Sequence, residues 1–566
     1  MKFEEFEYSR PDQQAVLCEL DEIEKSIKNA DNYETVKEAF LKLDELMRHY
    51  QTQYNLCYIR HTIDTADEFY SAEQDFFDES NPVIENHLNQ INRALLESPF
   101  ADELRKDVSE VWFKKAEFGL KSMSEEIIED MQADAKLQSA YQALIASAKI
   151  PFEGETYTLA SLQKKMADKD REVRKAATKA YWGWFEDHEQ EIGKIYDDMV
   201  RVRTKMAAKL GFENFIPLGY LNMQRLDYDQ NDVEQYRKNV LEDVVPVCNE
   251  LYEKQAAALG YPDFHIPAWD EKIEFLSGNP SPKHSKDEMV AAALNMYQEL
   301  SPETGEYFRK MVDQDLMDLE SKPGKAAGGY CTGIPDYKVP FIFANFNGTN
   351  SDVETLTHEA GHGFQAYSSR NIVPVTEMWP TMESAEIHSM SMEFFTWPWM
   401  KNFFEEDTDK YYFSHLGGSV KFIPYGVLVD HFQHEVYAHP EWSHEERMAC
   451  WRKLEKEYLP HKNYDEIDVL ERGGWWMRQL HIFMNPFYYI DYTLAQVCAL
   501  QFWKRLQDQD PKAFEDYKAI CEVGGTLPFR EIVKKANLKV PFEEGCLKET
   551  MESISDWYKD KNNADY

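Results

Sequence analysis

The sequence predicts a mostly α-helical protein with one small β-sheet, and three observations lead to this prediction. The first third of the chain is almost entirely helical in pattern, turn-forming residues become frequent near 260, and one convincing strand candidate follows at 338–346. A chain of 566 residues is too long for a single core, so we expect two or three substructures. We divide the chain into an N-terminal helical domain, 1–190, and a second helical domain, 191–566.

The helical elements are predicted by the spacing of apolar residues. Segments such as NYETVKEAFLKLDELMRHY and DREVRKAATKAYWGWFEDHEQ place apolar residues three and four positions apart, with few internal breakers. GYPDFHIPAWD and LSGNPSPKHSKDE contain many turn formers and separate helical blocks. The strand candidate KVPFIFANF follows a glycine-rich stretch, and further helices are expected at 351–370, at 382–400 and from there to the C-terminus.

Composition and charge exclude several classes of protein. Hydrophobic residues make up 43% of the chain, which is typical of a globular protein. The formal charge of −40, from 102 acidic and 62 basic residues, argues against nucleic acid as a partner. No signal peptide or membrane span is recognisable, and the 8 cysteines form no CxxC pair. We therefore expect reduced thiols, no membrane partner and a cytoplasmic location.

A metal-binding motif follows the strand candidate. Ser351 and Glu354 fit a capping box that begins a helix, and HEAGH occupies 358–362 two turns later. The four-residue separation places His358 and His362 on one helix face, where both imidazoles can bind one ion. Glu359 is displaced from that ion but can reach a water molecule beside it, so it is the candidate general base. Two glycines, at 361 and 363, suggest that another element approaches this helix closely.

A catalytic zinc ion needs a third protein ligand, and the sequence offers several. Position 368 is Ser368, so the third histidine of the HExxHxxGxxH class is missing. MESAEIHSMSMEFF supplies Glu383, Glu386 and Glu393. Glu386 and Glu393 share a helix face, so one can bind the metal while the other orients a histidine; Glu383 stays open on spacing alone. His388 points to roughly the opposite side from Glu386, so we interpret it as a core or supporting residue.

A second group of histidines has unsuitable spacing for a metal site. His431, His434, Glu435 and His439 cluster in DHFQHEVYAHP. His434 and His439 are five residues apart, which on a helix separates them by about 140°. We therefore expect a structural role for this group.

At these residues the sequence resembles the M3 family of zinc oligopeptidases, in particular its oligoendopeptidase F and Pz-peptidase branch. The matching segments are TLTHEAGHGFQAY, SAEIHSMSMEFF and HIFMNPFYYIDYTLAQ, with REVRKAATKAYWGWFE upstream. The resemblance implies a zincin-like helical protein of two lobes, with a small β-sheet beside the HExxH helix and zinc at the floor of a deep substrate channel. It also implies that Glu386 is the third ligand, and that the strand at 338–346 can pair with an extended peptide.

The tyrosine-rich segment near the C-terminus supplies further candidates. In the family, a histidine and tyrosines from this segment stabilise the tetrahedral intermediate. The matching residues here are His481, Tyr488, Tyr489 and Tyr492. On a continuous helix, His481, Tyr488 and Tyr492 share one side, so we favour these three and keep Tyr489 as the alternative. An imidazole or phenol that donates to a developing oxyanion is a common contribution to peptide hydrolysis.

The predicted function is that of a zinc-dependent oligoendopeptidase, which hydrolyses internal bonds of short peptides with one Zn²⁺ per chain. His358, His362 and Glu386 would bind the metal, and Glu359, His481, Tyr488 and Tyr492 would act in catalysis. Two alternatives stay open. One is a zinc carboxypeptidase, because another helical zinc family also combines HExxH with a later glutamate. The other is a non-catalytic peptide-binding metalloprotein, which Glu359 argues against. Oligopeptides are the expected partners, and the sequence gives no oligomeric state.

Overall fold

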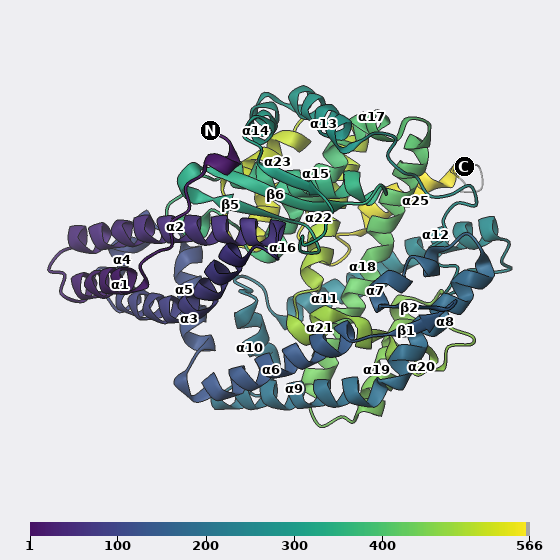
Figure 1. The fold of residues 1–566 in the computed structure, drawn as a ribbon, viewed down its shortest axis with the longest axis horizontal. Coiled ribbons are helices and arrows are strands. Elements are labelled where there is room, and N and C mark those ends of the chain that lie inside the picture. Colours follow the sequence, from purple (N-terminus) through teal and green to yellow (C-terminus); the bar gives the residue numbers. More distant parts are fainter. Residues whose placement is uncertain (562–566) are drawn as a thin grey trace. The chain divides into compact units, whose positions relative to one another are not determined.

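The computed structural model describes residues 1–561, and most of them are helical (Figure 1). Packing groups the chain into two compact units, each assembled from three separate stretches. Unit 1 contains Met1–Leu120, Pro280–Tyr411 and Cys498–Lys539, and unit 2 contains Lys121–Asn279, Tyr412–Val497 and the described residues from Val540 onward. The prediction of a mostly α fold with small sheets is confirmed.

Unit 1 is built mainly from helices of the N-terminal stretch, the middle stretch and a late stretch of the chain. Its helices are α1 (Gln13–Lys28), α2 (Tyr33–Ile63), α3 (Glu68–Leu96), α4 (Ala101–Asp107), α5 (Glu110–Ser122), α13 (Lys286–Leu300), α14 (Pro302–Asp313), α15 (Ser351–Ser368), α16 (Met382–Phe395), α17 (Lys401–Phe404), α23 (Ala513–Glu522) and α24 (Phe529–Lys535). Helices α18 (Thr408–Ala438) and α22 (Ile490–Gln507) each begin in one stretch of the chain and end in the next.

The N-terminal helices form an apolar core because their hydrophobic residues recur at helical spacing. In α1 the buried residues are Val16, Leu20, Ile23 and Ile27, which line the face that packs against α2 and α3. Full burial of such a side chain contributes about 1.5–3 kcal/mol to stability. Asp12 caps α1 by accepting the backbone N–H groups of its first turn. Pattern and cap together therefore determine where this helix begins and which face it buries.

A three-stranded sheet in unit 1 lies beside α15. Its strand order is β4 (Met317–Glu320), β6 (Val339–Phe346), β5 (Tyr330–Ile334), with β4 parallel and β5 antiparallel to β6. Helix α15 packs against β5 and β6 (Figure 1). The predicted strand at 338–346 is confirmed, but it is central, so both of its edges already pair with neighbours. The expectation that it accepts a peptide strand is therefore wrong, and the edges of this sheet belong to β4 and β5.

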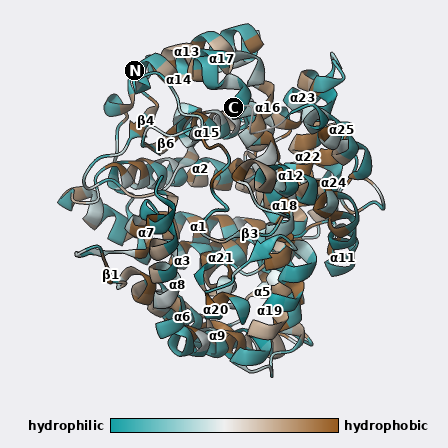
Figure 2. Cartoon of the chain, turned by 90° about the vertical axis from the view of Figure 1, so that its right-hand side faces the viewer, coloured by the Kyte–Doolittle hydropathy of each residue, from teal (hydrophilic) through white to brown (hydrophobic). Residues whose placement is uncertain are grey.

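Unit 2 contains the remaining helices and two small sheets. Its helices are α6 (Ile128–Ala146), α7 (Leu159–Leu162), α8 (Arg171–Asp187), α9 (Glu189–Lys209), α10 (Phe215–Asn222), α11 (Gln230–Asn239), α12 (Val245–Leu259), α19 (His444–Tyr458), α20 (Asp468–Glu471), α21 (Leu480–Met484) and α25 (Lys548–Lys559). Strands β1 (Ile150–Phe152) and β2 (Glu155–Tyr157) are antiparallel, whereas β3 (Ile266–Pro267) and β7 (Lys462–Asn463) are parallel. Figure 2 shows hydrophobic and hydrophilic residues mixed along most helices, as amphipathic packing requires.

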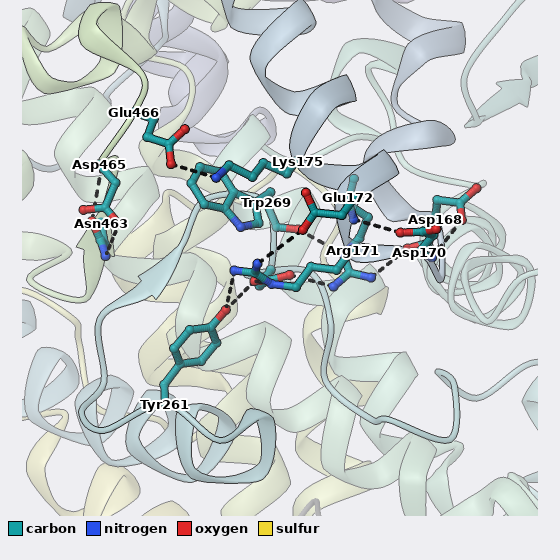
Figure 3. A network of polar contacts seen from close by, with 12 residues as sticks. Asp168, Asp170, Arg171, Glu172, Lys175, Tyr261, Trp269, Asn463, Asp465 and Glu466 are labelled. Atoms are coloured by element: carbon teal, nitrogen blue, oxygen red, sulfur yellow. Dashed lines mark hydrogen bonds and ion pairs between the residues drawn. The ribbon is translucent and has the colours of Figure 1, made fainter. Parts of the chain in front are cut away.

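Ion pairs fix the loop after α12 in unit 2. At the start of α8, Arg171 pairs with Asp270 at 2.8 Å. Arg171 also donates to the hydroxyl of Tyr261 (Figure 3). The next residue of this loop, Glu271, accepts from Lys462 at 2.7 Å and also contacts His461. Burial alone would raise the pKa of Glu271, but these two partners hold it well below its usual range.

Two expectations concern the chain as a whole. The predicted division between 190 and 191 lies within helix α9 of unit 2. It stays a prediction, because compact units describe packing and do not identify independently folding domains. Among residues 1–561, no helix is both long and apolar enough to cross a membrane.

Candidate metal centre

Helix α15 begins at the predicted residue but with a different cap. The residue before it, Asn350, is the N-cap and its side chain makes no capping hydrogen bond, so the expected capping box is not formed. Instead, Asp352 in the first turn accepts the backbone N–H groups of Asn347 and Gly348, at 2.9 and 2.7 Å. The loop that links β6 to α15 is therefore folded back onto the helix, where a carboxylate also complements the helix dipole.

Three potential ligands converge between α15 and α16. The Nε2 atoms of His358 and His362 lie 3.3 and 3.5 Å from one Oε2 atom of Glu386. Two ligands of a tetrahedral zinc ion, at bond lengths of about 2.0–2.2 Å, are separated by roughly 3.3 Å. The donor set therefore fits one metal ion. Among residues 1–561, His358, His362 and Glu386 form the group of His, Cys, Asp and Glu side chains whose ligand atoms lie close enough together to hold one metal ion. Neither Glu383 nor His388 belongs to this group.

The charges of the ligand group are mutually dependent. Burial alone would raise the pKa of Glu386, but the charge of His362 and hydrogen bonds from both histidines hold it well below its usual range. For His358, burial favours the neutral ring, but hydrogen bonds to Glu386 and Glu393 outweigh burial and raise its pKa. A carboxylate that stays ionised in this buried site is a suitable ligand for a cation.

Glu393 occupies the supporting position that its spacing predicts. Its Oε1 atom lies 2.7 Å from Nδ1 of His358, on the other side of the ring from Glu386. An ionised carboxylate can only accept, so this contact keeps a proton on Nδ1 of His358, and Nε2 is the nitrogen that would bind a metal after giving up its own proton. The two glutamates seven residues apart thus contact opposite nitrogens of one imidazole.

Glu359 lies beside the ligand group in a buried environment. Its residue exposure is 7%, and its Oε2 atom has no hydrogen-bond partner within residues 1–561. Burial raises the pKa of Glu359, and the neighbouring His358 and His362 oppose that shift. A buried carboxylate oxygen without a protein partner can accept a proton from a water molecule or a substrate.

The glycines of the motif allow two close approaches, as their presence in a helix predicts. A Cβ atom on Gly361 would lie 2.7 Å from both the carbonyl oxygen of His388 and the Cα of Ser389. A Cβ atom on Gly363 would lie 2.1 Å from the hydroxyl of Tyr307. Gly361 therefore permits backbone contact between α15 and α16, which sets the distance between the histidines and Glu386.

The late candidates gather within unit 2, although their helix is not continuous. His481 lies in α21 and Tyr492 in α22, with a turn between them, so the assumption of one helix is wrong. Their ring centroids nevertheless lie close: His481 is 5.8 Å from Tyr488 and 6.2 Å from Tyr492, and these tyrosines are 5.0 Å apart. Tyr489 is 4.8 Å from His481, and burial raises its pKa to about 12.

The turn before these tyrosines contains a strained residue. Phe487 has φ +69°, a left-handed conformation that is rare for a bulky side chain. Its carbonyl accepts from Arg225 at 2.8 Å, and its N–H donates to Gln433 at 3.0 Å. A Cβ atom on Gly219 would lie only 2.5 Å from the Phe487 ring, so the ring occupies the space that a side chain at position 219 would need. These contacts hold a conformation that the local sequence disfavours.

Within residues 1–561, the second histidine group is not among the side-chain clusters whose spacing suits a metal ion. His434 contacts Asp430 at 3.1 Å and the hydroxyl of Tyr220 at 2.9 Å, whereas His431 contacts the hydroxyl of Tyr458 at 3.1 Å. His431 also lies 3.5 Å from Glu435, so these two histidines have separate partners, and their structural role stays a prediction.

The comparisons with known proteins agree on one family of peptidases. The profile described as Peptidase family M3 matches residues 165–552, and that of the Peptidase M3 N-terminal domain matches residues 3–123. Among solved structures, the chain is 50% identical to a protein provisionally described as oligoendopeptidase F and 48% identical to a Pz peptidase A with an inhibitor. Both comparisons cover 100% of either chain, with a TM-score of 0.91.

The curated relatives are more distant. The oligoendopeptidase F homolog of Borreliella burgdorferi is 24% identical over 400 residues, which are 67% of this chain and 62% of that protein. The plasmid-encoded oligoendopeptidase F of Lactococcus lactis subsp. cremoris is 22% identical over 66% of this chain and 61% of that protein. The chain therefore spans less than two thirds of the length of these two relatives.

Proposed function

The chain belongs to peptidase family M3, a family of metallopeptidases, and we propose that it is a zinc-dependent oligoendopeptidase acting on internal bonds of short peptides. This proposal includes the metal ligands His358, His362 and Glu386, the general base Glu359, and a substrate range limited to oligopeptides. The identity of the metal, the position of the cleaved bond and the length limit are the parts that experiments must decide.

The observation that carries the proposal is the convergence of His358, His362 and Glu386 beside a buried Glu359. The separations of 3.3 and 3.5 Å between imidazole and carboxylate atoms suit one tetrahedral ion. Two imidazoles and a carboxylate favour zinc over magnesium or calcium, which prefer oxygen ligands, although cobalt or manganese can occupy such a site in vitro. The carboxylate of Glu359 supports catalysis, because a purely structural site needs no base beside its ligands.

The proposed mechanism uses a water molecule and no covalent intermediate. When bound, zinc acts as a Lewis acid that polarises a carbonyl and makes water more acidic. Glu359 accepts a proton from the attacking water and transfers it to the departing amine, and burial, which raises the pKa of its carboxyl above the ordinary value, makes it a stronger base. Glu393 holds the Nδ1 proton of His358, so that this ring keeps its orientation.

Donors from the late segment are proposed to stabilise the oxyanion. His481, Tyr488 and Tyr492 supply an imidazole and two phenols whose rings gather within about 6 Å of one another. Their assignment to this step rests on the family resemblance of HIFMNPFYYIDY. Tyr489 is the alternative donor, and replacement of each tyrosine by phenylalanine would identify which hydroxyl lowers kcat when it is removed.

The test is product analysis on a mixed library of peptides about 5 to 20 residues long, blocked at both termini. Cleavage at internal bonds that chelator abolishes and stoichiometric Zn²⁺ restores is the expected result. Loss of cleavage for the longer peptides would support an enclosed channel. Release of C-terminal residues from unblocked peptides alone would instead favour a carboxypeptidase, and bound peptide without any product would favour a binding protein.

Glu359→Gln separates metal binding from catalysis. The amide removes the base and keeps the shape of the side chain, so we expect kcat to fall by at least about 10³-fold while zinc content stays near one per chain. Substantial remaining activity would exclude Glu359 as the base. His358→Ala is the matched comparison, because it should lose both zinc and activity.

A further inference from the structure

The orientation of His481 depends on a short chain of hydrogen bonds within unit 2. The hydroxyl of Tyr425, in helix α18, donates to Oε1 of Gln479 at 2.5 Å. The amide nitrogen of Gln479 lies 2.8 Å from Nδ1 of His481, two residues later. Gln479 links the last residue of the turn Gly474–Arg478 to the first turn of α21. An imidazole on this short helix is thus connected to Tyr425 of the long helix α18, 54 residues upstream of Gln479.

The direction of the hydrogen bonds along this chain follows from the orientation of the Gln479 amide, whose Oε1 faces the Tyr425 hydroxyl and whose NH₂ group faces the His481 ring. Burial raises the pKa of Tyr425, so its phenol keeps the hydrogen that it donates. An amide oxygen only accepts and an amide NH₂ only donates. With Oε1 occupied by the phenol, Gln479 presents its NH₂ group to the ring, and Nδ1 of His481 must accept.

The environment of His481 favours a neutral ring. Burial lowers the pKa of His481 below its usual range. Its ring neighbours are Tyr488, Tyr489 and Tyr492, and within residues 1–561 no carboxylate lies within ion-pair distance of it. Within the described part of the chain, the His481 ring makes one hydrogen bond, and its partner is the side-chain amide of Gln479. A neutral imidazole that accepts at Nδ1 carries its one proton on Nε2.

We propose that Gln479, oriented by Tyr425, is a positioning residue that fixes His481 as the Nε2–H tautomer and thereby makes it a hydrogen-bond donor. The catalytic consequence rests on the proposed function, in which His481 donates to an oxyanion. The tautomer itself does not depend on that function. In the opposite tautomer, Nε2 would have a lone pair, which repels a developing negative charge.

Spectroscopy tests the tautomer directly. In protein labelled with ¹⁵N-histidine, two-bond ¹H–¹⁵N correlation spectra distinguish Nε2–H from Nδ1–H rings, and His481→Ala identifies the signal. We expect the proton on Nε2 in the wild-type chain. Gln479→Glu replaces the donor by an acceptor of the same shape, so at pH 9, where the ring is neutral, the proton should move to Nδ1. A wild-type ring protonated on Nδ1, or an unchanged ring in Gln479→Glu, would overturn the proposal.

Kinetics on a blocked peptide test the consequence. We expect Gln479→Glu to lower kcat about 100-fold, as loss of one oxyanion donor does, with KM within about threefold. Tyr425→Phe should lower kcat less, because the amide remains but can rotate. Gln163→Glu, just beyond α7, is the control for added charge and should leave kcat unchanged. Altered tautomer with unchanged kcat would refute the catalytic part. An inactive wild-type chain would refute the proposed function instead, while the spectra would still decide the tautomer.

Discussion

The close crossing of α15 and α16 at Gly361 provides a direct test of how the fold sets the metal site. Gly361→Ala adds a methyl group 2.7 Å from two backbone atoms, in His388 and Ser389, where ordinary contact begins near 3.4 Å. Because backbone atoms cannot rotate away, the helices must separate by about 0.7 Å, the difference between these two distances. The crossing lies two to three residues from Glu386, so the shift reaches the ligand group.

Such a separation is a large fraction of a metal–ligand bond. Zinc–oxygen bonds are about 2.0–2.2 Å, so a displacement of about 0.7 Å removes Glu386 from effective coordination unless the helix deforms. Even disturbed supporting residues reduce metal affinity about 10–100-fold, and we expect at least this loss. Overpacking should also lower the free energy of unfolding by about 1–3 kcal/mol, offset by up to about 1 kcal/mol because alanine favours the helix.

The measurement is a competition titration with a chromophoric chelator, together with thermal unfolding of the metal-free protein. Gly418→Ala, in α18, is the matched control, because a Cβ atom there meets nothing within 4 Å. That variant should keep its metal affinity and be as stable as the wild type or slightly more stable. If Gly361→Ala bound zinc as tightly as Gly418→Ala does, the crossing would not set the ligand distance and the reasoning would be refuted.

Three further predictions concern supporting residues. Glu393→Ala should reduce zinc affinity about 10–100-fold, measured by chelator competition, because His358 loses the carboxylate at 2.7 Å from its Nδ1; equal affinity would exclude an orienting role. Gly219→Ala should lower kcat more than it raises KM in peptide assays, because the new methyl group displaces the Phe487 ring, 2.5 Å away, and with it the tyrosine turn. Glu271→Gln should cost about 3 kcal/mol of unfolding free energy at pH 7. The folded-state pKa of this carboxyl lies below its ordinary 4.5, so its contribution to the free energy of unfolding is present above pH 4.5 and is lost as the pH falls. Denaturant unfolding should therefore show a smaller difference in stability between the variant and the wild type at pH 3 than at pH 7.

The sequence alone predicted the local features of the site. The HEAGH spacing identified two imidazoles on one face of a helix and a carboxylate beside them, because the period of an α-helix is constant. The seven-residue separation of Glu386 and Glu393 likewise predicted two carboxylates on one face, and the structure brings both to the same histidine. The choice of Glu386 over Glu383 as the ligand came from the family resemblance, since spacing along one helix did not distinguish them.

Sequence reasoning was less successful where residues distant along the chain must meet. The short strands beside β6 were missed, because a strand such as β4 has too few residues to show a hydrophobic period. The pairing of β4 with β6 decides which edges of the sheet remain unpaired. The late segment was treated as one helix, whereas Asn485 to Tyr489 form a turn with Phe487 in a left-handed conformation. No local pattern predicts that conformation, because Arg225 and Gly219 hold it from another part of unit 2.

The sequence by itself thus determined the helices, the family, and the residue types that can bind a metal and move a proton. Each of these depends on a short-range period or on a motif whose members lie within a few turns. Only the tertiary structure decided how closely α15 approaches α16, which nitrogen of His358 faces Glu386, and which residues contact His481. These properties depend on contacts such as that of Tyr425 with Gln479, whose members are separated by 54 residues and carry no shared signal in one sequence.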